Sequence, residues 1–323
     1  GSAVSWLRDQ GRALADENKP WALFVSLVNP HDIMYFNTDA PGQRVQDTGR
    51  LLMEAARAPQ NALYEKSWDI PLPANLEQPM NEAGRPAAHG EFLKAWGYTL
   101  GNIPPEEERW RRFNDFYLNS IRSVDQQLAL LLAELDALKL ADRTIVVFTS
   151  DHGESLGDHG LMYKGCRFYE GLVRVPLIFS WPRRFLKNQQ SDALVEMMDL
   201  SATLLELSGV PLPDYFQGKS LLPILTGQSD ASEHRNFVRS EYFDALDPHF
   251  TGGSGTYATM HRTQTHKLCV YHGKGVGELF DLANDPWEHR NLWDDPIHSK
   301  IKSQLIAESF DAHVLLTTDV GSK

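Results

Sequence analysis

The sequence is poor in cysteine and has neither a long hydrophobic run nor a basic cluster. Its two cysteines, Cys166 and Cys269, lie far apart among 323 residues, so they give no disulfide framework. No apolar run reaches the roughly eighteen residues of a membrane span, and we expect no membrane partner. The chain has 31 Lys and Arg against 43 Asp and Glu, a formal net charge of −12. This balance disfavours general nucleic-acid binding, which requires clustered positive charge.

The rest of the composition is that of a soluble globular protein. Hydrophobic residues make up 42% of the chain, and its length allows a sizeable buried core. We expect one large unit over residues 1–232 and a smaller one over residues 233–323. The boundary is placed near Ser232 because the apolar spacing becomes strand-like soon after it.

Apolar spacing predicts the main elements of the larger unit. Buried strands are indicated by the apolar runs over residues 21–28, 144–149 and 175–181. Three-to-four spacing over residues 104–139 indicates a long helix with one buried face. Residues 33–105 are punctuated by prolines and lack a regular period, so we expect an irregular insertion that sets substrate specificity.

The carboxyl-terminal unit shows a different pattern. Short segments of alternating apolar and polar residues follow residue 236, and a helix is indicated at about residues 297–315. Consecutive strands joined by short turns favour an antiparallel sheet, which the helix would cover.

Charged side chains gather directly after the run over residues 144–149. Asp151 and His152 end that run, and Gly153 then frees the backbone to turn. Ligands bind at such strand ends in α/β proteins, and adjacent Asp and His side chains at a turn can both reach one divalent cation. Lys164 follows in a glycine-rich loop, and a lysine near a cation favours an anionic, tetrahedral group. Taken alone, the Asp-His-Gly triplet is also compatible with an ordinary turn in which His152 has no special role.

Four blocks of sequence resemble the sulfatase family of the alkaline phosphatase superfamily. They are Phe24–Asp32 (FVSLVNPHD), Ser150–Gly160 (SDHGESLGDHG) with Lys164, Glu170 and Arg174–Ile178 (RVPLI), Asp199–Gly209 (DLSATLLELSG), and Glu278–Leu292 (ELFDLANDPWEHRNL). The Asp-His form of the metal pair looks most like the choline sulfatase and phosphonate monoester hydrolase branch. The four blocks occur in the family's order and span most of the chain.

The resemblance implies a fold and a reaction. The fold is α/β, an alkaline-phosphatase-like sandwich with a mostly parallel central sheet and a smaller antiparallel sheet with a helix. The reaction is metal-dependent hydrolysis of a small-molecule sulfate monoester. Asp151 and His152 would help to hold the divalent ion, either calcium or, because imidazole is a softer ligand, manganese.

The resemblance also assigns roles to other side chains. His31 would contact the ester or its leaving group, and Lys164 would bind a non-bridging oxygen. Asp158 and His159 are candidates for supporting the metal ligands from behind.

The sequence departs from the family pattern in one respect. Sulfatases form their formylglycine nucleophile in a Cys/Ser-x-Pro/Ala-x-Arg motif near the start of the domain, preceded by two metal-binding aspartates, and no such block precedes Asp151 here. The two cysteines lack the required proline and arginine. We therefore expect this sequence to correspond to the carboxyl-terminal two-thirds, roughly, of a sulfatase-like enzyme.

Other interpretations remain open at this stage. The same scaffold also hydrolyses phosphonate monoesters and phosphodiesters, and the chain by itself is also compatible with an inert fragment or a binding module. We expect the chain to expose a sheet edge and part of its core. This surface would be buried either in a homo-oligomer or by association with the missing family segment. The sequence leaves the cellular compartment undecided.

Overall fold

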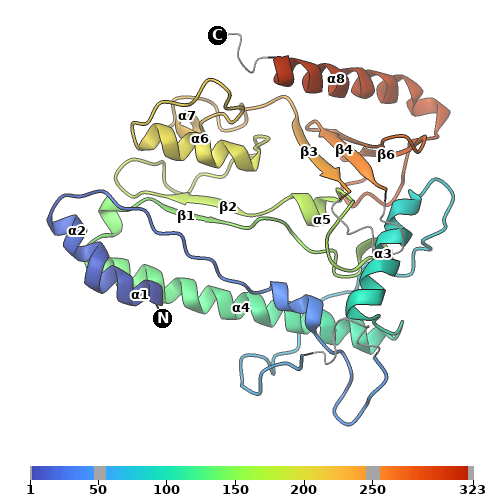
Figure 1. Cartoon of the computed structure of the whole chain (residues 1–323), viewed down its shortest axis with the longest axis horizontal. Coiled ribbons are helices and arrows are strands. Elements are labelled where there is room, and N and C mark those ends of the chain that lie inside the picture. The colour runs from blue at the N-terminus through green and yellow to red at the C-terminus, as the bar shows by residue number, and fades with distance from the viewer. Residues whose placement is uncertain (1, 47–55, 245–254, 319–323) are drawn as a thin grey trace.

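The computed structural model describes residues 2–46, 56–244 and 255–318. The helices and strands of these residues are, in chain order, α1 (Ser2–Trp6), a π-helix (Leu7–Gly11), α2 (Arg12–Asp16), a 3-10 helix (His31–Tyr35), α3 (Ala87–Leu100), α4 (Glu107–Ala137), a 3-10 helix (Ala141–Arg143), β1 (Val146–Thr149), a 3-10 helix (Asp158–Gly160), α5 (Glu170–Val173), β2 (Leu177–Ser180), α6 (Met197–Leu207), α7 (Leu222–Leu225), β3 (Val238–Phe243), β4 (Tyr257–Arg262), β5 (His266–Tyr271), β6 (Val276–Asp281), a 3-10 helix (Pro296–His298) and α8 (Ser299–Thr318). Figure 1 shows α4 running along one side of the molecule and α8 along the opposite side. None of the helices in these described ranges is long and apolar enough to cross a membrane.

The long helix predicted over residues 104–139 is confirmed as α4. It begins with Glu107 and Glu108, where the amino-terminal helix dipole favours acidic side chains. Near its other end, Leu135 packs with Leu7 of the amino-terminal helical segment in one buried cluster. Its first half packs instead against the residues that precede α3, so α4 connects the two ends of the molecule.

The central sheet of the described residues consists of β1 and β2, which confirm the runs predicted at 144–149 and 175–181. The strands pair antiparallel, with Val146 opposite Ser180 and Thr149 opposite Leu177. The mostly parallel arrangement that we expected is therefore not found in the residues that the structure describes. The connection over residues 150–176 contains the 3-10 helix (Asp158–Gly160) and the four-residue α5, and it returns to the strand end from which it left, as an antiparallel pair requires.

The segment over residues 21–28 is extended but pairs with no strand of the described ranges. Trp21 and Leu23 pack beside the cluster around Leu7. Farther along, Phe24 is 86% exposed and Val28 is 69% exposed. The prediction of a buried strand is wrong here, because an apolar run can indicate extended backbone but cannot supply the partner that buries it.

The predicted carboxyl-terminal sheet is confirmed. Its strands follow the order β3-β4-β5-β6, and each pair is antiparallel. Leu268 and Leu279 are fully buried against Leu305 of α8, which covers one face of the sheet. The proposed boundary near Ser232 stays a prediction.

The opposite side of this sheet packs on the loop between β1 and β2. The hydroxyl of Tyr271 donates to the carbonyl oxygen of Cys166 at 3.2 Å. Lys267 is fully buried and donates to the Phe168 carbonyl oxygen and to Glu288, at 2.8 and 2.7 Å. These contacts fix the loop that carries Lys164.

The irregular region over residues 33–105 contains one element that its prolines concealed, the helix α3. The helix begins after Pro86, and its face buries Ala88, Phe92 and Ala95. Phe92 lies against the active-site loop, since a Cβ on Gly165 would come within 2.0 Å of its ring. The helix α3 is therefore packed onto the loop rather than free in solvent.

Asp199 lies in the first turn of α6. The cap is Glu196, and Asp199 occupies the third helical position, where the two residues form a capping box. Its fully buried carboxylate also pairs with Arg235 and accepts from His234 at 3.0 Å. Asp199 therefore holds α6 to the segment that leads into β3.

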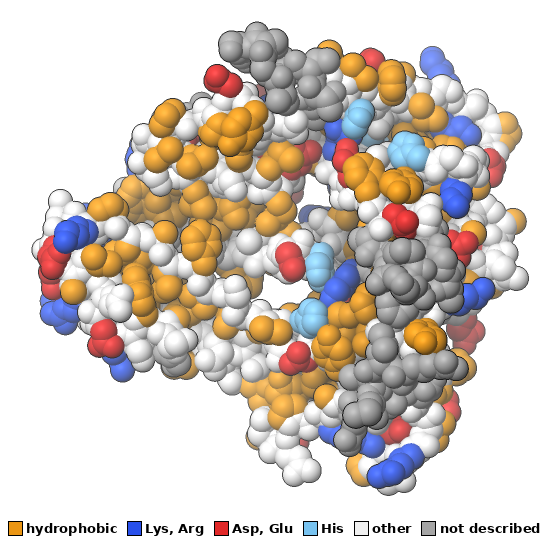
Figure 2. Space-filling model, viewed as in Figure 1, with side chains coloured by type: hydrophobic (Ala, Val, Ile, Leu, Met, Phe, Trp, Pro, Cys, Tyr) orange, Lys and Arg blue, Asp and Glu red, His pale blue; other side chains and the backbone are white. Residues whose placement is uncertain are grey.

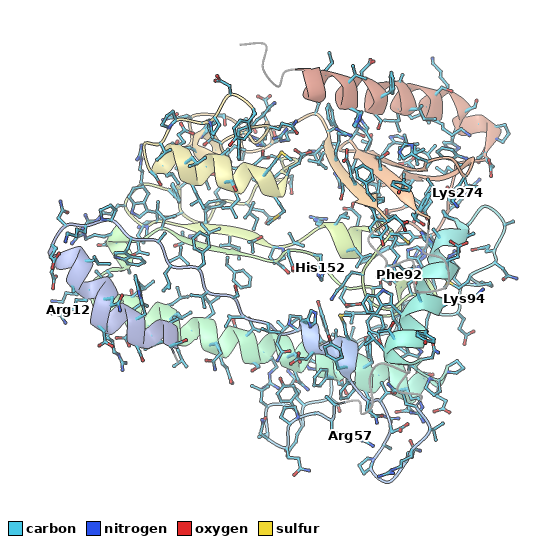
Figure 3. The ribbon with its side chains drawn as sticks, viewed as in Figure 1. Arg12, Arg57, Phe92, Lys94, His152 and Lys274 are labelled. Carbon is cyan, nitrogen blue, oxygen red and sulfur yellow. The ribbon has the colours of Figure 1, made fainter. Side chains whose placement is uncertain are left out.

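An open space separates α4 from the two sheets. Figure 2 shows the molecule hollowed here, with hydrophobic side chains along much of the hollow. Figure 3 places His152 at the edge of this space, just after β1.

Candidate active site

The turn after β1 is set by the close approach of two backbone segments. Gly153 N donates to Leu172 O at 2.8 Å, and Glu154 N donates to Gly171 O at 3.2 Å. A Cβ on Gly153 would lie only 1.9 Å from the Gly171 oxygen. Glycine is therefore required because there is no room for a side chain, rather than for the turning freedom that we expected.

Asp151 and His152 lie together at this turn. Their side chains come within 3.6 Å, between His152 Nε2 and Asp151 Oδ2, and both reach solvent. His152 Nδ1 lies 2.8 Å from the Gly153 oxygen, and a carbonyl only accepts, so Nδ1 carries the proton. This tautomer leaves the Nε2 lone pair free on the side of the Asp151 carboxylate, the arrangement of a metal-ligating histidine.

The pair supplies two ligands and not a complete metal site. Within residues 2–46, 56–244 and 255–318, no group of three or more His, Cys, Asp or Glu side chains gathers closely enough to hold a metal ion. The chemistry of the pair fits a divalent cation that completes its shell elsewhere.

His31 and Lys164 line one cavity of about 370 Å³. Lys164 is half-buried, and its Nζ lies 2.9 Å from Met34 Sδ. Burial lowers the pKa of Lys164, while the charges of Glu154 and Asp151 oppose this shift. No carboxylate of the described part of the chain lies within salt-bridge distance of this ammonium group, which therefore keeps its capacity for an anionic ligand.

His31 begins the 3-10 helix at the mouth of the cavity. It follows Pro30, and its exposed imidazole lies beside Tyr35 with the ring centroids 5.8 Å apart. The structure thus brings together two side chains that are 133 positions apart in the sequence (164 − 31). The charge of Asp151 also acts on Lys164, where it opposes the effect of burial on the lysine pKa.

His159 lines a different cavity, of about 190 Å³, whose lining also includes Arg85 and Glu278, and Asp158 precedes it in the same 3-10 helix. His159 is buried, donates from Nδ1 to Gln78 Oε1 at 2.9 Å, and stacks on Tyr169 with the ring centroids 3.8 Å apart. Burial lowers its pKa to about 3, and burial raises the pKa of Asp158. Neither side chain lines the cavity of His31 and Lys164, and their support of the metal ligands stays a prediction.

Neither cysteine has the properties of a nucleophile. Cys166 and Cys269 are both buried and free. Burial raises the pKa of Cys166 to about 12 and raises that of Cys269 well above its usual value. Both thiols are protonated near neutral pH, whereas nucleophilic cysteine is the thiolate.

Comparison with known proteins identifies the family of the chain. The sulfatase family model matches residues 3–210, and a second model, "N-sulphoglucosamine sulphohydrolase, C-terminal", matches residues 157–313. The chain belongs to the sulfatase family. The match includes the segments that carry His31, Asp151, His152 and Lys164, and it confirms the α/β fold class.

Individual relatives show the range of this sulfatase family. The chain is 27% identical to the Delta 4,5-hexuronate-2-O-sulfatase of Bacteroides thetaiotaomicron, covering 88% of this chain and 55% of that protein. It is 32% identical to arylsulfatase K of Xenopus laevis, covering 60% and 36%. Among solved structures, the phosphonate monoester hydrolase of Silicibacter pomeroyi is similar with a TM-score of 0.67 and 26% identity, covering 84% and 54%. The chain thus spans about half the length of its relatives, or less.

Two buried side chains of this sulfatase loop were not among the predicted site residues. Glu154 is buried, and burial raises its pKa, while the Ser155 N–H and the charges of Lys164 and Arg167 oppose this rise. Arg167 is buried and donates to the carbonyl oxygens of Met162 and Tyr163. Their place in the glycine-rich loop was visible in the sequence, but their burial was not.

The sequence analysis also did not predict the other residues that line the cavity of His31 and Lys164. Besides His31 and Lys164, the cavity is lined by Met34, Tyr35, Trp96, Thr99 and Leu100. The last three belong to α3, and the spacing of Phe92, Trp96 and Leu100 is helical. That spacing after Pro86 was a usable signal, which the surrounding prolines obscured.

Proposed function

We propose that the chain forms part of a metal-dependent hydrolase of sulfate monoesters. The observation that carries the proposal is the cavity shared by His31 and Lys164, together with the exposed pair of Asp151 and His152 on the loop that carries Lys164. The cavity offers an ammonium group without a carboxylate partner, and the turn offers two ligands for a cation. A small sulfate ester needs these two features.

Each side chain has a defined task in this proposal. Asp151 and His152 would hold a divalent cation, calcium or manganese, which supplies charge stabilisation when bound. Lys164 binds a non-bridging oxygen of the ester and orients the group. His31, at the solvent side, donates a hydrogen bond or a proton to the departing alcohol oxygen. No formylglycine motif precedes Asp151 in this sequence, so this chain's contribution is binding, orientation and proton transfer.

Calorimetric titration with 4-nitrophenyl sulfate in the presence of manganese tests this assignment. Replacing Lys164 with alanine removes a charge-assisted hydrogen bond, and we expect about a 10- to 100-fold loss of affinity. Lys219→Ala is the matched control, because Lys219 lies outside the cavity lining. An unchanged affinity in Lys164→Ala would contradict the proposal.

A second candidate function is hydrolysis of phosphonate monoesters, which the similarity to the Silicibacter pomeroyi enzyme favours. The two esters share a tetrahedral shape, and the same side chains would bind both. Parallel titrations with 4-nitrophenyl sulfate and an aryl phosphonate monoester distinguish the candidates by their relative affinity. Tighter binding of the phosphonate would favour the second function.

A further inference from the structure

The cavity of His31 and Lys164 has two chemically different sides. One side carries the imidazole and the ammonium group. The other is a hydrophobic wall built by Tyr35 with Trp96 and Leu100 of α3. Since a sulfate ester also has an anionic half and an alcohol half, the wall lies where the alcohol half would extend once Lys164 holds the anion.

Trp96 is held firmly in this wall. Its ring packs between those of Phe92 and Tyr163, at centroid distances of 5.8 and 6.1 Å. Leu100, one turn farther along α3, is 6% exposed. Thr99 donates its hydroxyl to the Ala95 oxygen at 3.0 Å, which fixes its side chain toward the helix. The wall is preformed, so a ligand does not have to order it.

The size of the cavity limits what the wall can hold. Its volume of about 370 Å³ lies at the lower end of the range typical of small-molecule sites. A flat indole and a phenol ring contact a ring-shaped ligand over a large area and a short alkyl group over a small one. The apolar lining also disfavours a charged alcohol half.

From these observations we propose that Trp96, with Tyr35 and Leu100, forms a platform for a six-membered ring in the alcohol half of the ester. The proposal rests on the proposed function and extends it to substrate class. An aryl ring and the apolar face of a pyranose present the same chemistry to this platform. Two of these three specificity-determining residues, Trp96 and Leu100, lie on α3, far in sequence from the Asp151 turn.

The test compares ligands that differ only in the alcohol half. Titration calorimetry with manganese measures the binding of 4-nitrophenyl sulfate, glucosamine 6-sulfate and methyl sulfate by the full chain. We expect Trp96→Ala to weaken at least one ring ester about tenfold while methyl sulfate binds as before. Trp96→Phe keeps an aromatic face and should recover part of the affinity, and it also controls for folding. Trp287→Ala, at a side chain that is 72% exposed and outside the cavity, should change nothing.

The outcomes separate the platform from the proposed function. Loss of the aryl ester alone identifies an aryl substrate, and loss of the sugar ester alone identifies a carbohydrate; either supports the platform. Equal affinity of Trp96→Ala and wild type for both ring esters overturns it, as does an equal loss for methyl sulfate or a wild type that binds no ring ester. Lys164→Ala should weaken every ester, and if it weakens none, the proposed function fails whatever Trp96 does.

Discussion

At the scale of single residues, the turn after β1 depends on Gly153, because the Gly171 carbonyl oxygen lies where a Cβ would be. Gly153→Ala would place a methyl group 1.9 Å from the Gly171 oxygen. We expect it to lower the free energy of unfolding by about 1–3 kcal/mol or more, because backbone must move to relieve the contact. Urea denaturation measures this change.

Gly90→Ala is the control for that substitution. Gly90 lies within α3, where an added Cβ would meet only Met80 at 3.5 Å, an ordinary contact. Alanine is also the better helix former, so this variant should be as stable as the wild type or more stable. Similar stability for the two variants would contradict the steric account of Gly153.

A second prediction concerns Glu278, which is buried in β6 between Tyr169 and Tyr271. Burial raises its pKa to about 7, although the hydrogen bonds from both tyrosines lower it. The folded protein therefore retains a proton that the unfolded chain releases near pH 4.3. Between these values the folded state binds more protons, so stability falls as pH rises.

Glu278→Gln removes this titration while keeping a polar side chain of the same size. We expect the variant to gain on the order of 3 kcal/mol relative to wild type between about pH 4.3 and about pH 7, with no further relative change above pH 7. Denaturant unfolding at several pH values measures it. Glu91→Gln, at an exposed side chain, should leave the pH profile unchanged. If the free energies of unfolding of Glu278→Gln and wild type changed with pH in the same way, this account of Glu278 would be contradicted.

At the scale of elements, residues 21–28 form an apolar extended segment with little cover. Phe24 and Val28 are 86% and 69% exposed. We expect the chain to bind the dye ANS and to self-associate, and the double variant Phe24→Ser, Val28→Ser to do both less. Fluorescence and sedimentation velocity measure these effects.

The folding stability of that double variant should remain close to wild type, because it removes no buried contact. Trp287→Ser, which replaces a single exposed aromatic residue in the loop after β6, is the control and should leave dye binding unchanged. If the double variant bound ANS as strongly as the wild type, the segment would not be the apolar surface responsible.

How well the sequence predicted each element depended on whether neighbouring residues alone determine it. The periodic spacing of α4 and the alternation in β3 to β6 are local signals, and both predictions are confirmed. Pairing is not local. The antiparallel partner of β1 and the missing partner of residues 21–28 depend on where a distant segment lies, and the spacing contains no such information.

The residues of the site also differ in whether a local sequence pattern could predict them. Asp151, His152 and Lys164 share one loop, and motif spacing identified them together. His31 was placed near them by family resemblance and lies in the same cavity as Lys164. Trp96 and Thr99 escaped prediction because α3 is surrounded by prolines, and no local pattern links that helix to Lys164.

At the scale of the whole molecule, two packed regions meet around an open hollow. α4 and the amino-terminal helices form one side, and the carboxyl-terminal sheet with α3 forms another. His152 of the proposed site lies at the edge of the hollow (Figure 3). The overall charge of −12 does not oppose an anionic substrate there, because Lys164 and the cation act locally.

The central claim is that Asp151 and His152 hold a divalent cation next to Lys164. The most direct measurement is anomalous X-ray scattering from crystals of the chain soaked with manganese and sulfate. The account predicts a manganese peak within about 2.5 Å of His152 Nε2 and of an Asp151 carboxylate oxygen, with sulfate in contact with Lys164 Nζ. His152→Ala should lose the peak. A peak elsewhere, or one that persists without the imidazole, would contradict the assignment of the site.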